Sequence, residues 1–158
     1  MTWNPHITVA AVCERNGKFL IIEELSAGEL VFNQPAGHLD PNESLIDAVI
    51  RETREESAWR FTPTALLGLY LWQQPDNGET ILRVAFIGDC DDHRADQPLD
   101  TGIERALWFS RDELVRSDRL RSPLVLQSID DYLGGQRLPL SAVVDALPRS
   151  ADLAVAAE

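Results

Sequence analysis

A helix that turns carboxylates toward its own apolar side is the feature that most constrains this 158-residue chain. Asp40, Pro41 and Glu43 give the pattern of an N-cap, a first-turn proline and a capping-box acid, so a helix is predicted from about Pro41. At about 100° per residue, an apolar stripe runs along this helix. The stripe consists of Leu45, Ala48 and Val49, with Ile46 at its edge.

Three glutamates, Glu52, Glu55 and Glu56, continue that stripe, so all three are expected to face inward. Two like charges about 4 Å apart repel by roughly 1 kcal/mol in water and about 4 kcal/mol at a protein surface, and burial adds to the cost. A hard divalent cation reverses the sign of this interaction. Mg²⁺ is the first choice and Mn²⁺ the second. The alternative, a solvated acidic run at a helix end, is disfavoured by the face on which the glutamates lie.

The segment 37–59, GHLDPNESLIDAVIRETREESAW, resembles the Nudix box in type and spacing. The matching positions are Gly37, Glu43, Arg51, Glu52, Glu55 and Glu56. Two positions depart from the pattern, because Thr53 stands where an aliphatic residue is usual and Ala58 replaces the closing glycine. A left-handed backbone at Ala58 should cost on the order of 1 kcal/mol. The hydroxyl of Thr53 is expected to bond back to an earlier carbonyl.

The resemblance implies an α+β fold, the Nudix α/β/α sandwich with a mixed β-sheet and a loop-helix-loop. It implies metal binding by the three glutamates, with the carbonyl of Gly37 as a further ligand. One glutamate, Glu55 or Glu52, would double as the base, and Arg51 would orient Glu55. Glu43 would be structural, holding the loop through Arg51.

The family often recruits one more acid from a distant loop, and the sequence leaves its identity open. The candidates are Asp89, Asp91, Asp92, Asp96, Asp100 and Glu104.

Further segments, WNPHITVAAV, GKFLIIEE, FNQPAGHLD and LRSPLVLQSIDDYLGGQRLPL, resemble a group of bacterial Nudix phosphatases. This resemblance implies Mg²⁺-dependent hydrolysis of nucleoside tri- and diphosphates and of the thiamine precursor 4-amino-2-methyl-5-hydroxymethylpyrimidine diphosphate, with release of inorganic phosphate. One rival is a pyrophosphatase that cuts oxidised nucleotides or ADP-ribose. Another is a sensor that binds a nucleotide without turnover, which the intact glutamates disfavour.

Four residues are candidates for substrate binding. Trp72 at a hairpin end and Phe32 are candidate shelves for a base ring, with Trp3 and Tyr70 also available, although aromatic residues are more often core. Arg83 would either bind a terminal phosphate or pair with an acid in the sheet. His38 follows the box glycine closely enough to meet a phosphate, although a lone histidine is more often structural.

The net charge of −12 and the pI near 4.6 argue against nucleic acid or an anionic membrane as a partner, since both require clustered positive charge. The partner is therefore expected to be a small nucleotide or pyrimidine diphosphate. Cys13 and Cys90 lack the spacing of a zinc site. Because no long apolar run occurs, a cytoplasmic location is expected. The chain is expected to be a monomer, with a homodimer as the alternative.

Residues 1–140 are expected to form one Nudix hydrolase domain and 141–158 a C-terminal tail that is partly disordered. Strands are predicted over 6–13, 18–24, 30–34, 65–73, 80–89 and 105–109, with an Asn-Gly hairpin joining the first two. Helices are predicted over 111–115 and 122–133, the second with Leu126, Ile129 and Leu133 inward and ended by Gly134-Gly135. The acidic stretch 90–102 is expected to be a mobile loop beside the active face.

Overall fold

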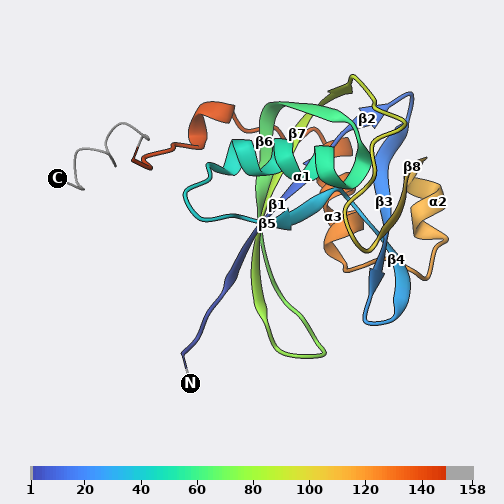
Figure 1. The fold of residues 1–158 in the computed structure, drawn as a ribbon, viewed down its shortest axis with the longest axis horizontal. Coiled ribbons are helices and arrows are strands. Elements are labelled where there is room, and N and C mark those ends of the chain that lie inside the picture. The colour runs from blue at the N-terminus through green and yellow to red at the C-terminus, as the bar shows by residue number, and fades with distance from the viewer. Residues whose placement is uncertain (1, 149–158) are drawn as a thin grey trace.

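The computed structural model describes residues 2–148. It contains two β-sheets and a small number of helices (Figure 1). The first sheet has the strand order β5 (Ala36–His38), β1 (His6–Val12), β7 (Thr80–Asp91) and β6 (Arg60–Gln73). In the second sheet, β3 (Lys18–Ser26) pairs with β2 (Glu14–Arg15), β4 (Glu29–Asn33) and β8 (Ile103–Phe109). The helices are α1 (Leu45–Ser57), α2 (Arg111–Val115) and α3 (Leu124–Leu133), followed by a 3₁₀ turn at Leu140–Ala142.

The first sheet is mixed, because β1 runs parallel to β7 while its other pairings are antiparallel. Both faces of β1 are covered. Val9 and Ala11 belong to the apolar cluster that contains α1, while Ala10 and Val12 belong to the cluster that contains α3. This double burial explains why the β1 sequence is a continuous apolar run rather than an alternating one. The expected α+β class with a mixed sheet is confirmed.

The Asn-Gly turn is present, but it joins different strands from those expected. Asn16 and Gly17 adopt φ values of +51° and +77°, as a two-residue hairpin turn requires, and they connect β2 to β3. The preceding strand β1 pairs with β5 and β7 in the other sheet. The predicted pairing of the first two long strands is therefore wrong, because β2 is a short extension at which the chain changes sheets.

Helix α1 begins at Leu45, so the predicted start at Pro41 is wrong. Asn42 has a φ of +62°, which interrupts any helix there, and Ser44 is the N-cap, with its hydroxyl accepting the amide of Asp47 at 3.0 Å. The helix ends at Ser57, and its C-cap Ala58 adopts the left-handed conformation with a φ of +61°. Thr53 is buried and its hydroxyl donates to the carbonyl of Val49 at 2.7 Å, as expected.

Helix α2 has the predicted bounds, and α3 starts two residues later than predicted. The hydroxyl of Ser122 accepts the amide of Leu124 at 3.2 Å, so this serine helps to start α3. Ile129 is fully buried, whereas Leu133 is 55% exposed, so the predicted inward position of Leu133 is wrong. Gly134 ends the helix as predicted.

The acidic connection after β7 is fastened to the C-terminal end of α1. The amide of Arg94 donates to the carbonyl of Ala58 at 3.0 Å, and the amide of Asp100 donates to the carbonyl of Glu55 at 2.9 Å. The side chain of Gln97 adds a bond to the carbonyl of Arg54 at 2.8 Å. These contacts hold Asp100 beside α1.

Beyond α3, Leu140 and Val143 pack against the cluster that contains α1. The rest of the predicted tail, residues 149–158, lies outside the described residues, and the boundary at residue 140 stays a prediction. Within residues 2–148, no helix is both long and apolar enough to cross a membrane.

Candidate active site

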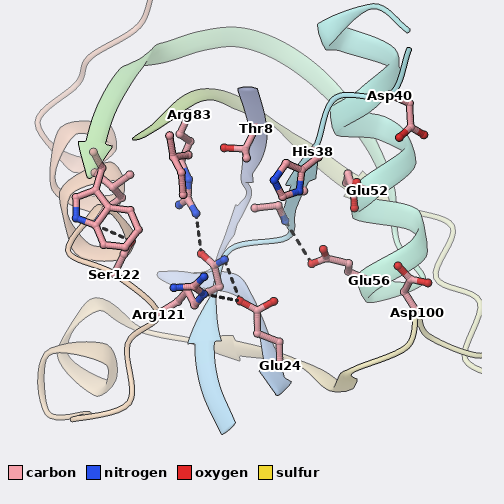
Figure 2. A pocket seen from close by; sticks show the side chains of 16 residues that line it. Thr8, Glu24, His38, Asp40, Glu52, Glu56, Arg83, Asp100, Arg121 and Ser122 are labelled. Atoms are coloured by element: carbon pink, nitrogen blue, oxygen red, sulfur yellow. Dashed lines mark hydrogen bonds and ion pairs between the residues drawn. The ribbon is translucent and has the colours of Figure 1, made fainter. Parts of the chain in front are cut away.

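A cavity of about 350 Å³ opens where α1, the first sheet and the segment before α3 meet. Its lining comes from elements that are far apart in the sequence. Glu52, Glu56 and Asp100 lie on one side, Arg83 and Arg121 lie on the other, and Glu24 lies beside Arg121 (Figure 2). The lining residues that matter below are Thr8, Glu24, Asn33, Gly37, His38, Glu52, Glu56, Trp72, Arg83, Asp100, Arg121 and Ser122.

On the acidic side, Glu52 and Glu56 project from α1 and are both buried. Burial, together with the nearby charges of Glu24 and Glu52, raises the pKa of Glu56 to about 9. Burial also raises the pKa of Glu52, although its hydrogen bond to Arg51 opposes the shift. Full ionisation of this cluster at neutral pH therefore requires a compensating positive charge.

Gly37 is a glycine for a steric reason that concerns Glu52. A methyl group added at Gly37 would overlap all three atoms of the Glu52 carboxylate group. The missing side chain leaves room for that carboxylate beside the β5 backbone. The box glycine therefore permits the position of Glu52 in the cavity.

Arg51 organises the loop before α1. Its guanidinium donates to Glu43 at 2.6 and 2.9 Å, to Glu52 at 2.9 Å and to Glu55 at 3.1 Å. It also reaches the carbonyl of His38 at 3.1 Å. These hydrogen bonds lower the pKa of Glu43, with the bond to Arg51 as the largest cause.

The expectation that all three glutamates face inward holds for Glu52 and Glu56 but not for Glu55. The side chain of Glu55 is 41% exposed, it bonds to Arg51, and it does not line the cavity. At about 100° per residue it lies toward the edge of the stripe, where the wall of the cavity ends.

On the basic side, Arg83 is buried on β7 and Arg121 lies in the segment before α3. The guanidinium of Arg83 donates to the amide oxygens of Gln34 at 3.3 Å and Asn33 at 3.2 Å. Burial lowers the pKa of Arg83 to about 10. The nearest pairing of Arg121 is with Glu24, at 3.7 Å. Trp72, at the end of β6, lines the same cavity.

Of the other residues expected to bind substrate, His38 lines the cavity and Phe32 does not. Phe32 is 4% exposed and packs edge-to-face on Phe109, with Arg119 over its ring. We therefore assign Phe32 to the core. Tyr70 is tied to Asp131 through a 2.7 Å hydrogen bond, and Trp3 is exposed on the N-terminal segment.

Sequence reasoning missed Glu24 and Thr8, and it left Asp100 as one of six candidate acids. Each of these residues reaches the cavity from a different element. Glu24 lies near the end of β3, where the sequence shows only an acidic residue after an apolar run, so the local pattern carries no signal for it. Asp100 is the candidate acid that reaches the cavity because its backbone amide donates to the carbonyl of Glu55 in α1.

The donor set fits a hard divalent ion, because carboxylate oxygens from Glu52, Glu56 and Asp100 line one side of the cavity. The buried, mutually repelling carboxylates of Glu52 and Glu56 favour a cation at this place, and the missing side chain of Gly37 is what lets the Glu52 carboxylate lie there. Within residues 2–148, no group of three or more acidic, histidine or cysteine side chains is already arranged around a common point. The side chains would therefore have to draw together around an ion. Cys13 and Cys90 are buried free thiols outside this lining.

The sequence matches the NUDIX domain family over residues 4–127. The chain belongs to the Nudix hydrolases, which act on phosphoric anhydrides of small nucleotide-like molecules and generally use a divalent metal.

More particularly, the chain is 39% identical over 143 residues to the proteins named Phosphatase NudJ of Escherichia coli strain K12 and Shigella boydii serotype 4, covering 90% of this chain and 93% of each relative. A solved NUDIX hydrolase from Nitrosomonas europaea is 46% identical, with a TM-score of 0.87, and the match covers 90% of this chain and 97% of that one. The fold is shared with a MutT NUDIX hydrolase from Burkholderia pseudomallei. That structure is 23% identical, with a TM-score of 0.68, and the match covers 81% of this chain and 98% of that one.

Proposed function

We propose that this enzyme is a Mg²⁺-dependent phosphatase that hydrolyses nucleoside tri- and diphosphates, and 4-amino-2-methyl-5-hydroxymethylpyrimidine diphosphate, with release of inorganic phosphate. The observation that carries the proposal is the divided cavity, with buried carboxylates facing buried arginine across a space of about 350 Å³. A bound polyphosphate would be neutralised by a cation held on the carboxylate side and by hydrogen bonds from the positively charged arginine side. The similarity to Phosphatase NudJ over 90% of the chain supports the same assignment.

Mg²⁺, with Mn²⁺ as its substitute, would be held by Glu52 and Glu56 together with Glu55, and the carbonyl of Gly37 is a further proposed ligand. Asp100 is our choice for the additional acid, because it is the member of the candidate set that lines the cavity. The ion would neutralise charge that develops on the phosphate oxygens during hydrolysis. The Glu43 carboxylate accepts hydrogen bonds from Arg51 and from the amide of Asp40, so its proposed role is structural.

We assign the proton-accepting role to Glu55, with Glu52 as the alternative. Glu55 is partly exposed, so water can reach its carboxylate, and Arg51 holds that carboxylate at 3.1 Å. A base must lie within hydrogen-bond reach of the water that it deprotonates. Arg51 is thus a positioning residue for both glutamates.

Substrate contacts are assigned to the opposite side and the rim. Arg83 would meet phosphate oxygens, and His38, which follows Gly37 on β5, is a second candidate because it also lines the cavity. Trp72 would pack against the base or pyrimidine ring, since a flat aromatic side chain at a cavity mouth offers a stacking surface. Ser122 and Arg121 complete this rim.

Product analysis tests the proposal. Purified enzyme with Mg²⁺ is given each nucleoside triphosphate, each diphosphate and the pyrimidine diphosphate, and orthophosphate and pyrophosphate are measured separately. We expect orthophosphate from the triphosphates. Pyrophosphate as the product would instead support the rival pyrophosphatase, with oxidised nucleotides and ADP-ribose as the next substrates to examine. Light scattering of the same sample tests the expected monomer against the homodimer.

A further inference from the structure

Two buried polar atoms on the wall of the cavity lack hydrogen-bond partners. Among residues 2–148, these atoms are Oγ1 of Thr8 and Nε of Arg83. Thr8 is 8% exposed and Arg83 is 7% exposed, and both line the cavity. They are direct neighbours, because Thr8 of β1 lies opposite Arg83 of β7 in the parallel pairing. Figure 2 shows the two side chains next to each other on the wall that faces Glu52 and Glu56.

Among the described residues, Arg83 is also without an ion-pair partner, since the carboxylates of Glu24 and Glu56 act on its charge only from beyond ion-pair distance. Its two terminal nitrogens are occupied by the amide oxygens of Gln34 and Asn33, which are neutral acceptors. In the described part of the chain, Arg83 forms no ion pair with a carboxylate. Gln34 is itself fixed by donation to the carbonyl of Val125 at 2.8 Å, and Asn33 by donation to Glu24 at 3.2 Å. The direct contacts therefore orient the guanidinium through neutral acceptors, and within residues 2–148 no carboxylate touches it.

A buried guanidinium with one unpaired N–H and a buried hydroxyl without a partner are both unfavourable for folding. A ligand that supplies an anionic oxygen would satisfy both at once, because Nε–H and the threonine hydroxyl can each donate to it. Hydrogen bonds to a charged acceptor are shorter and stronger than neutral ones. A neutral aminopyrimidine edge could also use the two atoms, but it would leave the charge of Arg83 unmatched.

We propose that Thr8 and Arg83 form an anion subsite that holds the terminal phosphate of the substrate, opposite the carboxylates of Glu52 and Glu56. The proposal rests on the function proposed above and deepens it. A phosphate at the end of a chain offers three non-bridging oxygens, whereas a phosphate substituted on both sides offers two. The subsite accordingly favours substrates with a free phosphate end over ADP-ribose, in which each phosphate carries a ribose ester on one side and the anhydride bridge on the other.

Thr8→Val is the central test, because valine keeps the shape of threonine and removes only the unpartnered hydroxyl. Thr64→Val is the matched control: Thr64 lies on β6 away from the cavity lining, and its hydroxyl donates to the carbonyl of Ile87 at 3.3 Å. Binding of orthophosphate and of imidodiphosphate is measured by calorimetry, first in EDTA and then with Mg²⁺. Melting temperatures are measured for both variants.

For Thr8→Val we expect anion binding at least about tenfold weaker, and a melting temperature equal to or above that of the wild type. Thr64→Val should bind both anions like the wild type and melt at an equal or lower temperature. Arg83→Met should weaken binding by about a hundredfold. The subsite is refuted if Thr8→Val binds the anions within about twofold of the wild-type affinity. It is also refuted if the wild type binds neither anion.

Steady-state kinetics of Thr8→Val distinguish failure of the subsite from failure of the proposed function. In Thr8→Val, the KM for a nucleoside triphosphate should rise about tenfold while kcat changes little, and any turnover of ADP-ribose should be unaffected. The assignment of the terminal phosphate is contradicted if Thr8→Val loses kcat/KM equally with both substrates. It is also contradicted if the loss is specific to aminopyrimidine substrates while phosphate binding stays normal. Release of pyrophosphate by the wild type would refute the proposed function while the anion-binding result still decides the subsite.

Discussion

Gly37→Ala is expected to abolish catalysis by displacing one carboxylate, with only a modest loss of stability. The new methyl group would overlap the carboxylate of Glu52. Because that group is the end of a flexible side chain, it can rotate away while the backbone stays in place. The displacement breaks the 2.9 Å ion pair with Arg51, and removes an oxygen donor from the acidic side of the cavity.

The magnitude follows from those two contacts. A partly exposed ion pair contributes up to about 1 kcal/mol, and an unfavourable rotamer costs about 1 kcal/mol. The total of about 1–2 kcal/mol corresponds to a melting temperature lower by about 2–8 °C for a chain of this length. The value of kcat/KM should fall at least about a hundredfold, as expected when a metal or base function is lost.

Calorimetric melting and phosphate-release kinetics measure both effects, and a double mutant isolates their cause. In a Glu52→Ala background the overlapping atoms are absent, so Gly37→Ala should cost no stability there and change the residual rate by less than about threefold. Gly134→Ala, at the ordinary φ of −70° after α3, is the control and should leave kinetics unchanged. An equal stability penalty in both backgrounds, or near-normal activity of Gly37→Ala, would refute the reasoning.

Three further predictions concern α1, the turn that ends it and strand β3. Glu55→Gln and Glu56→Gln should each lower turnover at least about a hundredfold while circular dichroism stays native, and normal rates in both would end the assignment of these glutamates. Glu23→Gln should lower stability by about 1 kcal/mol at pH 7, because two half-exposed arginines hold the Glu23 carboxylate at 2.9 and 3.0 Å. These arginines lower the pKa of Glu23, so its contribution to the free energy of unfolding is present above the ordinary carboxyl pKa and is lost as the pH falls through the lowered value. The difference in melting temperature between wild type and variant should therefore disappear when melting is measured in acid. Ala58→Gly removes the strain of a left-handed alanine, about 1 kcal/mol, but also removes a buried methyl group that contributes about 0.8 kcal/mol. We therefore expect a melting temperature raised by less than about 4 °C and unchanged kinetics. A large change in rate would mean that this turn shapes the site.

The start of α1 shows where local sequence signals stop being decisive. Two capping patterns compete within five residues, one at Asp40 and one at Ser44. The structure uses the second, because Glu43 accepts two hydrogen bonds from Arg51 and one from the amide of Asp40, which stabilises a turn instead of a helical start. Those bonds depend on the position of Arg51, two helical turns later, and a short window of sequence does not contain it.

The sequence by itself determined the box, the helix that carries it and the inward direction of Glu52 and Glu56, because helical periodicity and residue spacing are local properties. Only the tertiary structure decided that Glu24, Asp100, Thr8 and Arg83 join them around one cavity, and that Phe32 does not. Each of these residues is brought in by the pairing of strands or by a loop fastened to a helix end. Such contacts depend on long-range packing, for which the identity of a single residue gives no local signal.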